Sequence, residues 1–187
     1  MSMKVIAVLN QKGGSGKTTI ATHLARAFQF TGSSVVLIDS DPQGSARDWS
    51  AAREEQPLSV IGIDRPTIER DLKSLAATDF AVIDGAPQAA DLAVSAIKAA
   101  DFVLIPVQPS PYDIWAAADL VDLVKQRIEV TDGKLQAAFV VSRAIHGTKT
   151  RTRSWRRFKW VRFASINDTN SSASNLPRHR GVRRNRF

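Results

Sequence analysis

The sequence contains no cysteine among its 187 residues, which excludes disulfides, thiolate metal sites and iron–sulfur clusters. It also lacks a long apolar run. The stretch from Val5 to Leu9 is far shorter than the ~20 residues that a membrane-spanning helix needs, and no small-residue cleavage site of a signal peptide follows it. We therefore expect a protein of the reducing cytoplasm with no membrane partner.

Acidic residues are almost missing from the end of the chain. Residues 1–150 hold 15 lysines and arginines against 17 acidic residues, whereas residues 151–187 hold 11 basic residues and only one acidic residue, Asp168. The net charge of +8 therefore comes from the last 37 residues. We predict a nearly neutral domain over residues 1–150 and an irregular basic C-terminal tail over residues 151–187.

Short apolar segments alternate with amphipathic ones along the first 150 residues. The expected strands are residues 4–9, 35–38, 58–63, 80–83, 102–105 and 139–141. The expected helices run from Gly16 to just before Gly32, near 44–55, near 67–76, and from about 113 with one face formed by Ile114, Ala117, Val121, Val124 and Ile128. This alternation predicts the α/β class, with a parallel, doubly wound sheet covered by helices on both faces.

A glycine-rich loop separates the first expected strand from the first expected helix. It reads Lys12-Gly13-Gly14-Ser15-Gly16-Lys17-Thr18-Thr19. Glycines let backbone N–H groups approach phosphates closely, and the start of a helix adds the positive end of its dipole. A lysine at position 17 supplies charge to the β- and γ-phosphates, and a threonine at position 18 supplies a hydroxyl to Mg²⁺. The loop therefore predicts a site for ATP and Mg²⁺.

Carboxylates follow two further strands. Asp39-Ser40-Asp41-Pro42-Gln43-Gly44 comes at the end of the second strand, where parallel sheets bind ligands. Asp84 follows four apolar residues, as in a Walker B strand, and is expected to reach Mg²⁺. Paired aspartates are also common in ordinary turns, and four apolar residues before an aspartate are a weak pattern in isolation; the second segment becomes a strong indication because it follows the glycine-rich loop.

Together these motifs resemble those of the ParA/MinD family of P-loop ATPases, over residues 3 to about 148. The loop has the deviant Walker A form K-G-G-x-G-K-T-T, with Lys12 added and Gln11 where the usual motif has glycine. The resemblance implies the P-loop NTPase fold, nucleotide contacts along residues 13–19, and catalytic roles for Lys12, Lys17 and Asp41. It places Lys12 on the phosphates of a partner subunit, Asp41 by the attacking water, and Thr18, Asp39 and Asp84 around Mg²⁺.

The same resemblance implies a weak, Mg²⁺-dependent DNA-partition ATPase. Such a protein forms a homodimer in its ATP state, binds DNA without sequence preference on the nucleoid, and responds to a centromere-binding partner protein. Two alternatives stay open. One is a metabolic ligase of the same superfamily, of the cobyrinate or biotin-pathway type, and the other is an inactive, truncated relic.

The basic tail does not match the family pattern, and no helical or strand period of apolar residues runs through it. One interpretation is a disordered arginine-rich arm, with Trp155 and Trp160 available to stack on bases. The other is an altered reading frame, because a shifted frame across residues 154–161 would encode a pattern that suits a helix ending in glycine. In either case we expect this chain to bind DNA through the tail, largely independently of nucleotide.

Overall fold

The computed structural model describes residues 3–53, 57–75 and 78–143. A single sheet of six strands forms its centre, in the order β3-β2-β4-β1-β5-β6, and every neighbouring pair is parallel. The strands are β1 (Lys4–Val8), β2 (Val35–Asp39), β3 (Ser59–Gly62), β4 (Phe80–Asp84), β5 (Phe102–Val107) and β6 (Gln136–Val141). The helices are α1 (Lys17–Phe30), α2 (Ser45–Ala51), α3 (Ile68–Leu72), α4 (Ala90–Ala99), α5 (Pro111–Ala116) and α6 (Ala118–Val130).

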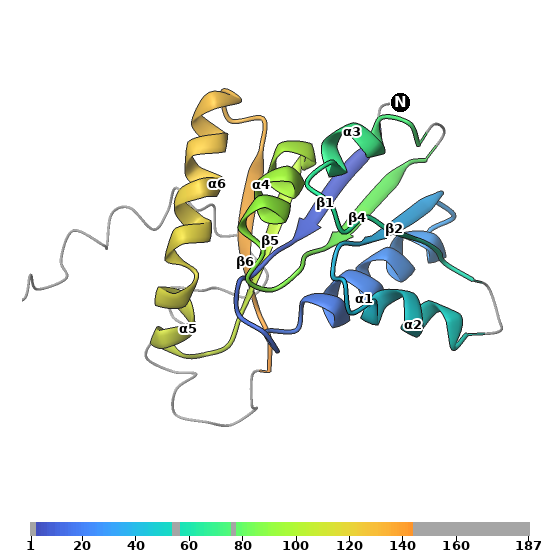
Figure 1. Ribbon diagram of the computed structural model, residues 1–187, viewed down its shortest axis with the longest axis horizontal. Helices are drawn as coiled ribbons and strands as arrows, with labels where there is room; N and C mark the ends of the chain where they lie inside the picture. The colour runs from blue at the N-terminus through green and yellow to red at the C-terminus, as the bar shows by residue number, and fades with distance from the viewer. Residues whose placement is uncertain (1–2, 54–56, 76–77, 144–187) are drawn as a thin grey trace, which may run out of the picture.

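Helices cover both faces of the sheet, as predicted for a doubly wound fold. Figure 1 shows α1 and α2 on one face and α3, α4 and α6 on the other. Because successive strand residues point to opposite faces, β1 sends Val5 and Ala7 into the core under α3, α4 and α6, and Ile6 and Val8 into the core under α1 and α2. Strands buried on both sides explain why each one reads as a continuous apolar run.

The first helix confirms its sequence pattern. Ala21 and Ala25 are fully buried against the sheet, with Ile20, Leu24 and Phe28 packed beside them. A glycine in the left-handed conformation, Gly32 with φ 85°, follows the helix and donates its N–H to Gln29.

One helix was not predicted, and two expectations about the helices were wrong. The sequence pattern did not predict α4, whose buried face is formed by Leu92, Ser95, Ala96 and Ile97. The long helix expected from about residue 113 is two helices, α5 and α6, because the chain breaks at Ala117 with an i→i+3 bond to Ile114. The break turns Ile114 away from the common face, so that it is 37% exposed while Leu120 is fully buried.

No helix within the described ranges is both long and apolar enough to span a membrane. The boundary predicted at residue 150, the basic tail and its altered-frame interpretation lie outside the described residues.

Candidate nucleotide site

The glycine-rich loop lies at the carboxyl edge of the sheet, between the end of β1 and the start of α1. Gly14 and Gly16 have φ values of 68° and 95°, which a side chain would strain, so glycine is needed at both positions. Two polar residues brace the loop. Asn10 donates to the Pro106 carbonyl (2.6 Å) and accepts the N–H of Lys12 (2.8 Å). From the end of β6, the Ser142 hydroxyl donates to the Ser15 carbonyl (2.7 Å).

Lys17 folds back over this loop. Its Nζ donates to the Lys12 carbonyl at 3.1 Å, and the residue is only 7% exposed. Burial lowers the pKa of the Lys17 ammonium, and the negative charges of Asp84 and Asp41 oppose that shift. The structure therefore places a buried cation beside two of the predicted carboxylates.

Asp84 is the least satisfied polar group at this edge. It is fully buried at the end of β4, and neither of its carboxylate oxygens has a hydrogen-bond partner of good geometry among the described residues; the Thr18 hydroxyl lies near it without completing such a bond. Burial raises the pKa of Asp84 to about 7; the nearby Thr18 hydroxyl and the Lys17 ammonium lower it, and the charges of Asp39 and Asp41 raise it further. A buried carboxyl without a partner is costly, so this geometry fits a group that receives a cation.

The Ser15 hydroxyl is the other buried polar group without a partner in the described part of the chain. It belongs to the loop that would surround phosphate, so the donor set fits a phosphate together with a cation near Asp84. No group of three or more histidines, cysteines, aspartates or glutamates that could hold a metal occurs in residues 3–53, 57–75 and 78–143. Mg²⁺ does not need such a group, because it is commonly held by one or two carboxylates together with substrate phosphates.

Asp39 lies next to Asp84 across the β2–β4 pairing, but its oxygens are occupied. Oδ1 accepts the N–H of Asp41 (3.1 Å), and Oδ2 accepts both the N–H (3.1 Å) and the Nε (3.4 Å) of Arg47. Asp41 is half-buried, and its Oδ1 accepts the N–H of Gln43 (3.0 Å). The structure thus groups all three predicted carboxylates at one edge, but only Asp84 is left without partners.

Lys12 is held within its own chain. Its Nζ lies 2.6 Å from Oδ1 of Asp113, which is 4% exposed. The other oxygen of Asp113 accepts the N–H of Gln108 (3.2 Å). This ion pair ties the glycine-rich loop to α5, whose Tyr112 and Trp115 are largely exposed and contact each other edge to face.

Sequence patterns missed three residues of this site: Arg47, Asp113 and Ser142. Each lies far along the chain from the group it contacts or outside any motif, so only the tertiary structure identifies it. Gly85 has a structural reason to be glycine, because a Cβ there would lie 2.5 Å from a Leu9 methyl group and 2.9 Å from the Val8 carbonyl oxygen.

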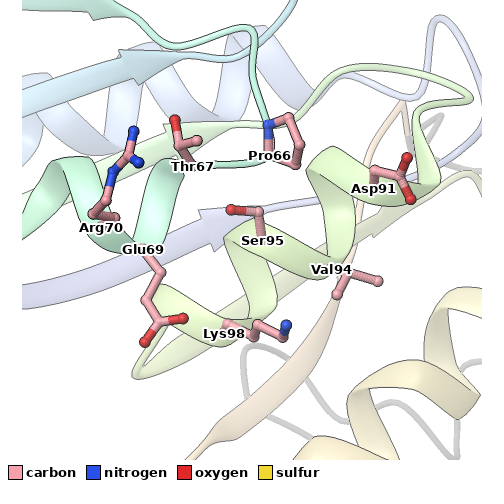
Figure 2. Close-up of a pocket in the computed structure, with 8 residues that line it drawn as sticks. All are labelled: Pro66, Thr67, Glu69, Arg70, Asp91, Val94, Ser95 and Lys98. Atoms are coloured by element: carbon pink, nitrogen blue, oxygen red, sulfur yellow. The ribbon is translucent and has the colours of Figure 1, made fainter.

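A separate cavity of about 450 Å³ lies between α3 and α4 (Figure 2). Charged side chains of both signs and two hydroxyls line it, and no lining residue belongs to the glycine-rich loop or the carboxylate segments: Pro66, Thr67, Glu69, Arg70, Asp91, Val94, Ser95 and Lys98. The chemistry described above therefore belongs to the sheet edge rather than to this cavity.

Comparison with known proteins gives a consistent result. The model of the CobQ/CobB/MinD/ParA nucleotide binding domain matches residues 6–176. The "Maintenance of carboxysome distribution protein A" of Halothiobacillus neapolitanus is 36% identical over 143 residues, which are 73% of this chain and 65% of that protein. The "Chromosome-partitioning ATPase Soj" of Thermus thermophilus is 30% identical over 152 residues, 65% of this chain and 61% of that protein. The chain thus spans less than two thirds of the length of these relatives.

Solved structures share the fold at lower identity. A cobyrinic acid a,c-diamide synthase from Mycobacterium smegmatis, with a bound ATP analogue and magnesium, matches with a TM-score of 0.66 at 22% identity, over 78% of each chain. A plasmid partition protein from Borrelia burgdorferi matches with a TM-score of 0.70 at 18% identity, over 87% of this chain and 88% of that one. Since both a synthase and a partition protein have this fold, the fold alone does not distinguish the two functions.

Proposed function

This chain belongs to the CobQ/CobB/MinD/ParA nucleotide-binding family, and on that premise we propose that it is a weak, Mg²⁺-dependent ATPase of the partition type. The observation that carries the proposal is the burial of the Asp84 carboxyl without a partner among the described residues. It lies beside Lys17 and Thr18, which begin the helix that follows the glycine-rich loop. A phosphate-bound Mg²⁺ is the group whose charge would satisfy this set.

In this proposal the backbone of Gly13 to Thr19 and the Ser15 hydroxyl bind the phosphates. Lys17 neutralises their charge from its buried position. Thr18 and Asp84 hold Mg²⁺, which neutralises the negative charge on the phosphates when it is bound. Asp39, whose oxygens are already occupied, contributes to the metal site at a distance, through water or by fixing the turn that follows it.

Asp41 is the proposed orienting group for the attacking water. It is half-buried at the same edge, and within residues 3–53, 57–75 and 78–143 a hydrogen bond reaches its Oδ1 but not its Oδ2, which leaves Oδ2 to accept one from water. Lys12 is proposed to leave Asp113 and to contact the phosphates of a second copy of the chain. The cost of that exchange falls on Asp113, a buried carboxylate that would lose its ion pair.

We further propose that the ATP state is a homodimer acting on non-specific DNA in the cytoplasm, on the nucleoid, with a centromere-binding partner protein that stimulates hydrolysis. The name of the Thermus relative, a chromosome-partitioning ATPase, supports this assignment. A bound nucleotide that sets the dimer population, and a slow hydrolysis that resets it, would make the chain a switch.

A second candidate is the positioning of a protein compartment. Two relatives named for maintenance of carboxysome distribution, at 36% and 37% identity, favour it. The chemistry at the sheet edge is the same in both cases, so the two candidates differ in cargo and partner and not in the reaction. The synthase alternative is supported by fold likeness and by the breadth of the family model, which covers CobQ and CobB as well as MinD and ParA.

The test measures ATP binding and phosphate release by the full chain, with Mg²⁺ and with EDTA. We expect Mg²⁺-dependent binding and a slow release of phosphate that increases with DNA and a partner protein. A slowly hydrolysed ATP analogue should also produce a dimer in light scattering. Phosphate release that depends on a small carboxylate substrate would instead identify a ligase, and the absence of Mg²⁺-dependent ATP binding would refute the proposal.

A further inference from the structure

Arg47 donates four hydrogen bonds to the carboxylate segment, although it lies outside the motifs. We propose that Arg47 is a positioning residue, whose guanidinium holds the turn from Asp39 to Gly44 in the shape that aims Asp41 at its water. This inference rests on the proposed ATPase function, because it concerns the same reaction.

The first contacts join Arg47 to Asp39. Both the backbone N–H (3.1 Å) and the side-chain Nε (3.4 Å) of Arg47 donate to Oδ2 of Asp39, which is wholly shielded from solvent. The carboxylate therefore receives a charge and also satisfies an N–H in the first turn of α2, which has no intrahelical partner. The same carboxylate accepts the N–H of Asp41 through Oδ1, so Arg47 and Asp41 are linked through one rigid group.

The second contacts join Arg47 to the turn itself. Nη2 of Arg47 donates to the carbonyls of Asp41 (3.3 Å) and Pro42 (3.5 Å). The Asp41 carbonyl also accepts the N–H of Gly44 (2.9 Å), which closes the turn. The backbone of Asp41 is thereby held on its N–H side through Asp39 and on its carbonyl side by Arg47 directly.

Two glycines leave room for this guanidinium. A Cβ at Gly44 would lie 3.0 Å from Nη2 of Arg47, and a Cβ at Gly62 would lie 3.1 Å from Nη1. Gly62 ends β3 directly opposite Asp39 in the β2–β3 pairing. The space that holds the guanidinium is thus formed by the two segments adjoining the carboxylates.

If Arg47 only stabilised the fold, its loss would lower ATP affinity and turnover together. The side chain is 44% exposed, so its loss removes little buried area, but it also leaves the buried carboxylate of Asp39 without its ion pair and lowers stability for that reason. Its contribution lies in fixing a geometry, and misplacing a catalytic group by ~1 Å can cost ~100-fold in rate without weakening substrate binding. Lysine would keep the charge but lose the fork that reaches Asp39 and two carbonyls at once.

The experiment compares Arg47→Gln and Arg47→Lys with Arg53→Gln in the full chain. Arg53 is the matched control, since it follows α2 and stacks on Trp49 (4.4 Å) without contacting the carboxylates. Single-turnover phosphate release and the affinity for Mg²⁺ with an ATP analogue are measured for each. Hydrogen exchange of the amides in residues 41–47 is measured without nucleotide.

For both Arg47 variants we expect turnover to fall ~10–100-fold while analogue affinity stays within ~3-fold, and loop amides to exchange at least ~10-fold faster. Arg53→Gln should match the parent in all three measurements. A fall in affinity equal to the fall in rate, full rescue by lysine, or unchanged loop exchange would overturn the role of Arg47. If the parent itself does not bind Mg²⁺ and ATP, the proposed function fails, and loop exchange alone then decides whether Arg47 holds the turn.

Discussion

The buried carboxyl of Asp84 makes the protein without nucleotide less stable as the pH rises. Its pKa increases from 3.8 in the unfolded chain to about 7 in the fold, so the folded state binds the proton more tightly than the unfolded state. The resulting penalty is absent below pH 3.8, grows between the two pKa values and is complete above pH 7. A shift of this size corresponds to about 4 kcal/mol of unfolding free energy.

Asp84→Asn removes the titration and retains the shape. The asparagine amide will also lack a partner, at a cost of about 1–3 kcal/mol, but that cost does not vary with pH. The difference in unfolding free energy between variant and parent should therefore rise by about 2–3 kcal/mol from pH 5 to pH 8, in favour of the variant. Comparing the two pH values cancels the amide term and every other titrating group that both chains share.

Urea unfolding at the two pH values, in EDTA and without nucleotide, gives this difference. Asp122→Asn serves as the matched control, because it makes the same chemical change on the exposed side of α6, near Lys125 (4.0 Å). It should show no such pH dependence. A variant-minus-parent difference that is equal at pH 5 and pH 8 would refute the account of Asp84 as a buried carboxyl without a partner. With Mg²⁺ and an ATP analogue added, the parent should gain stability and Asp84→Asn should gain much less.

Four further predictions concern the other parts of the chain. Lys17→Ala should lower ATP affinity at least ~30-fold, measured by titration calorimetry, because it removes the buried cation beside the phosphates; unchanged affinity would contradict the site. Lys12→Ala should keep nucleotide binding but lose the dimer that an ATP analogue induces. If light scattering still detects the dimer, the role of Lys12 is only the ion pair with Asp113. Asp41→Ala should retain ATP and slow its hydrolysis ~100-fold or more, so release of phosphate at the parental rate would assign the water to another group. A chain ending at residue 150 should lose most of its DNA affinity at low salt. The full chain should bind DNA equally well with ATP or ADP. A large gain in DNA affinity with ATP at ~150 mM salt would instead show that the tail is part of the switch.

The sequence alone was sufficient for the parts of this fold that local patterns specify. The strands were predicted because burial on both faces makes each a short apolar run, and α1 because its apolar stripe is regular and is followed by glycine. Low amphipathicity does not explain why α4 was missed, because its buried face, with Leu92, Ala96 and Ile97, follows a regular helical spacing. The break at Ala117 was hidden because no proline or glycine marks it.

The candidate site also has a part that local patterns predict and a part that depends on contacts between residues distant in sequence. The shared position of the glycine-rich loop, Asp39, Asp41 and Asp84 was predictable, because each follows a strand and all carboxyl ends of a parallel sheet meet at one edge; their roles stay predictions. The ion pair of Lys12 with Asp113 joins residues 101 positions apart, and the contact of Ser142 with Ser15 joins residues 127 positions apart. No local pattern encodes such pairs, because the geometry arises only when the sheet is assembled.

The pairing of charges at the sheet edge explains why the carboxylates should behave differently when altered. Asp39 is neutralised by Arg47, and Asp113 by Lys12, so each of these buried carboxylates is satisfied before any ligand arrives. Asp84 has no such partner in the described residues, and Lys17, whose charge acts on Asp84, instead donates its hydrogen bond to the Lys12 carbonyl. Removing a paired carboxylate should therefore lower the stability of the fold. Removing Asp84 should instead raise the unfolding free energy near neutral pH and abolish the stabilisation by Mg²⁺. Opposite effects on stability from these three carboxylates, which are similarly buried, would therefore identify Asp84 as the cation position.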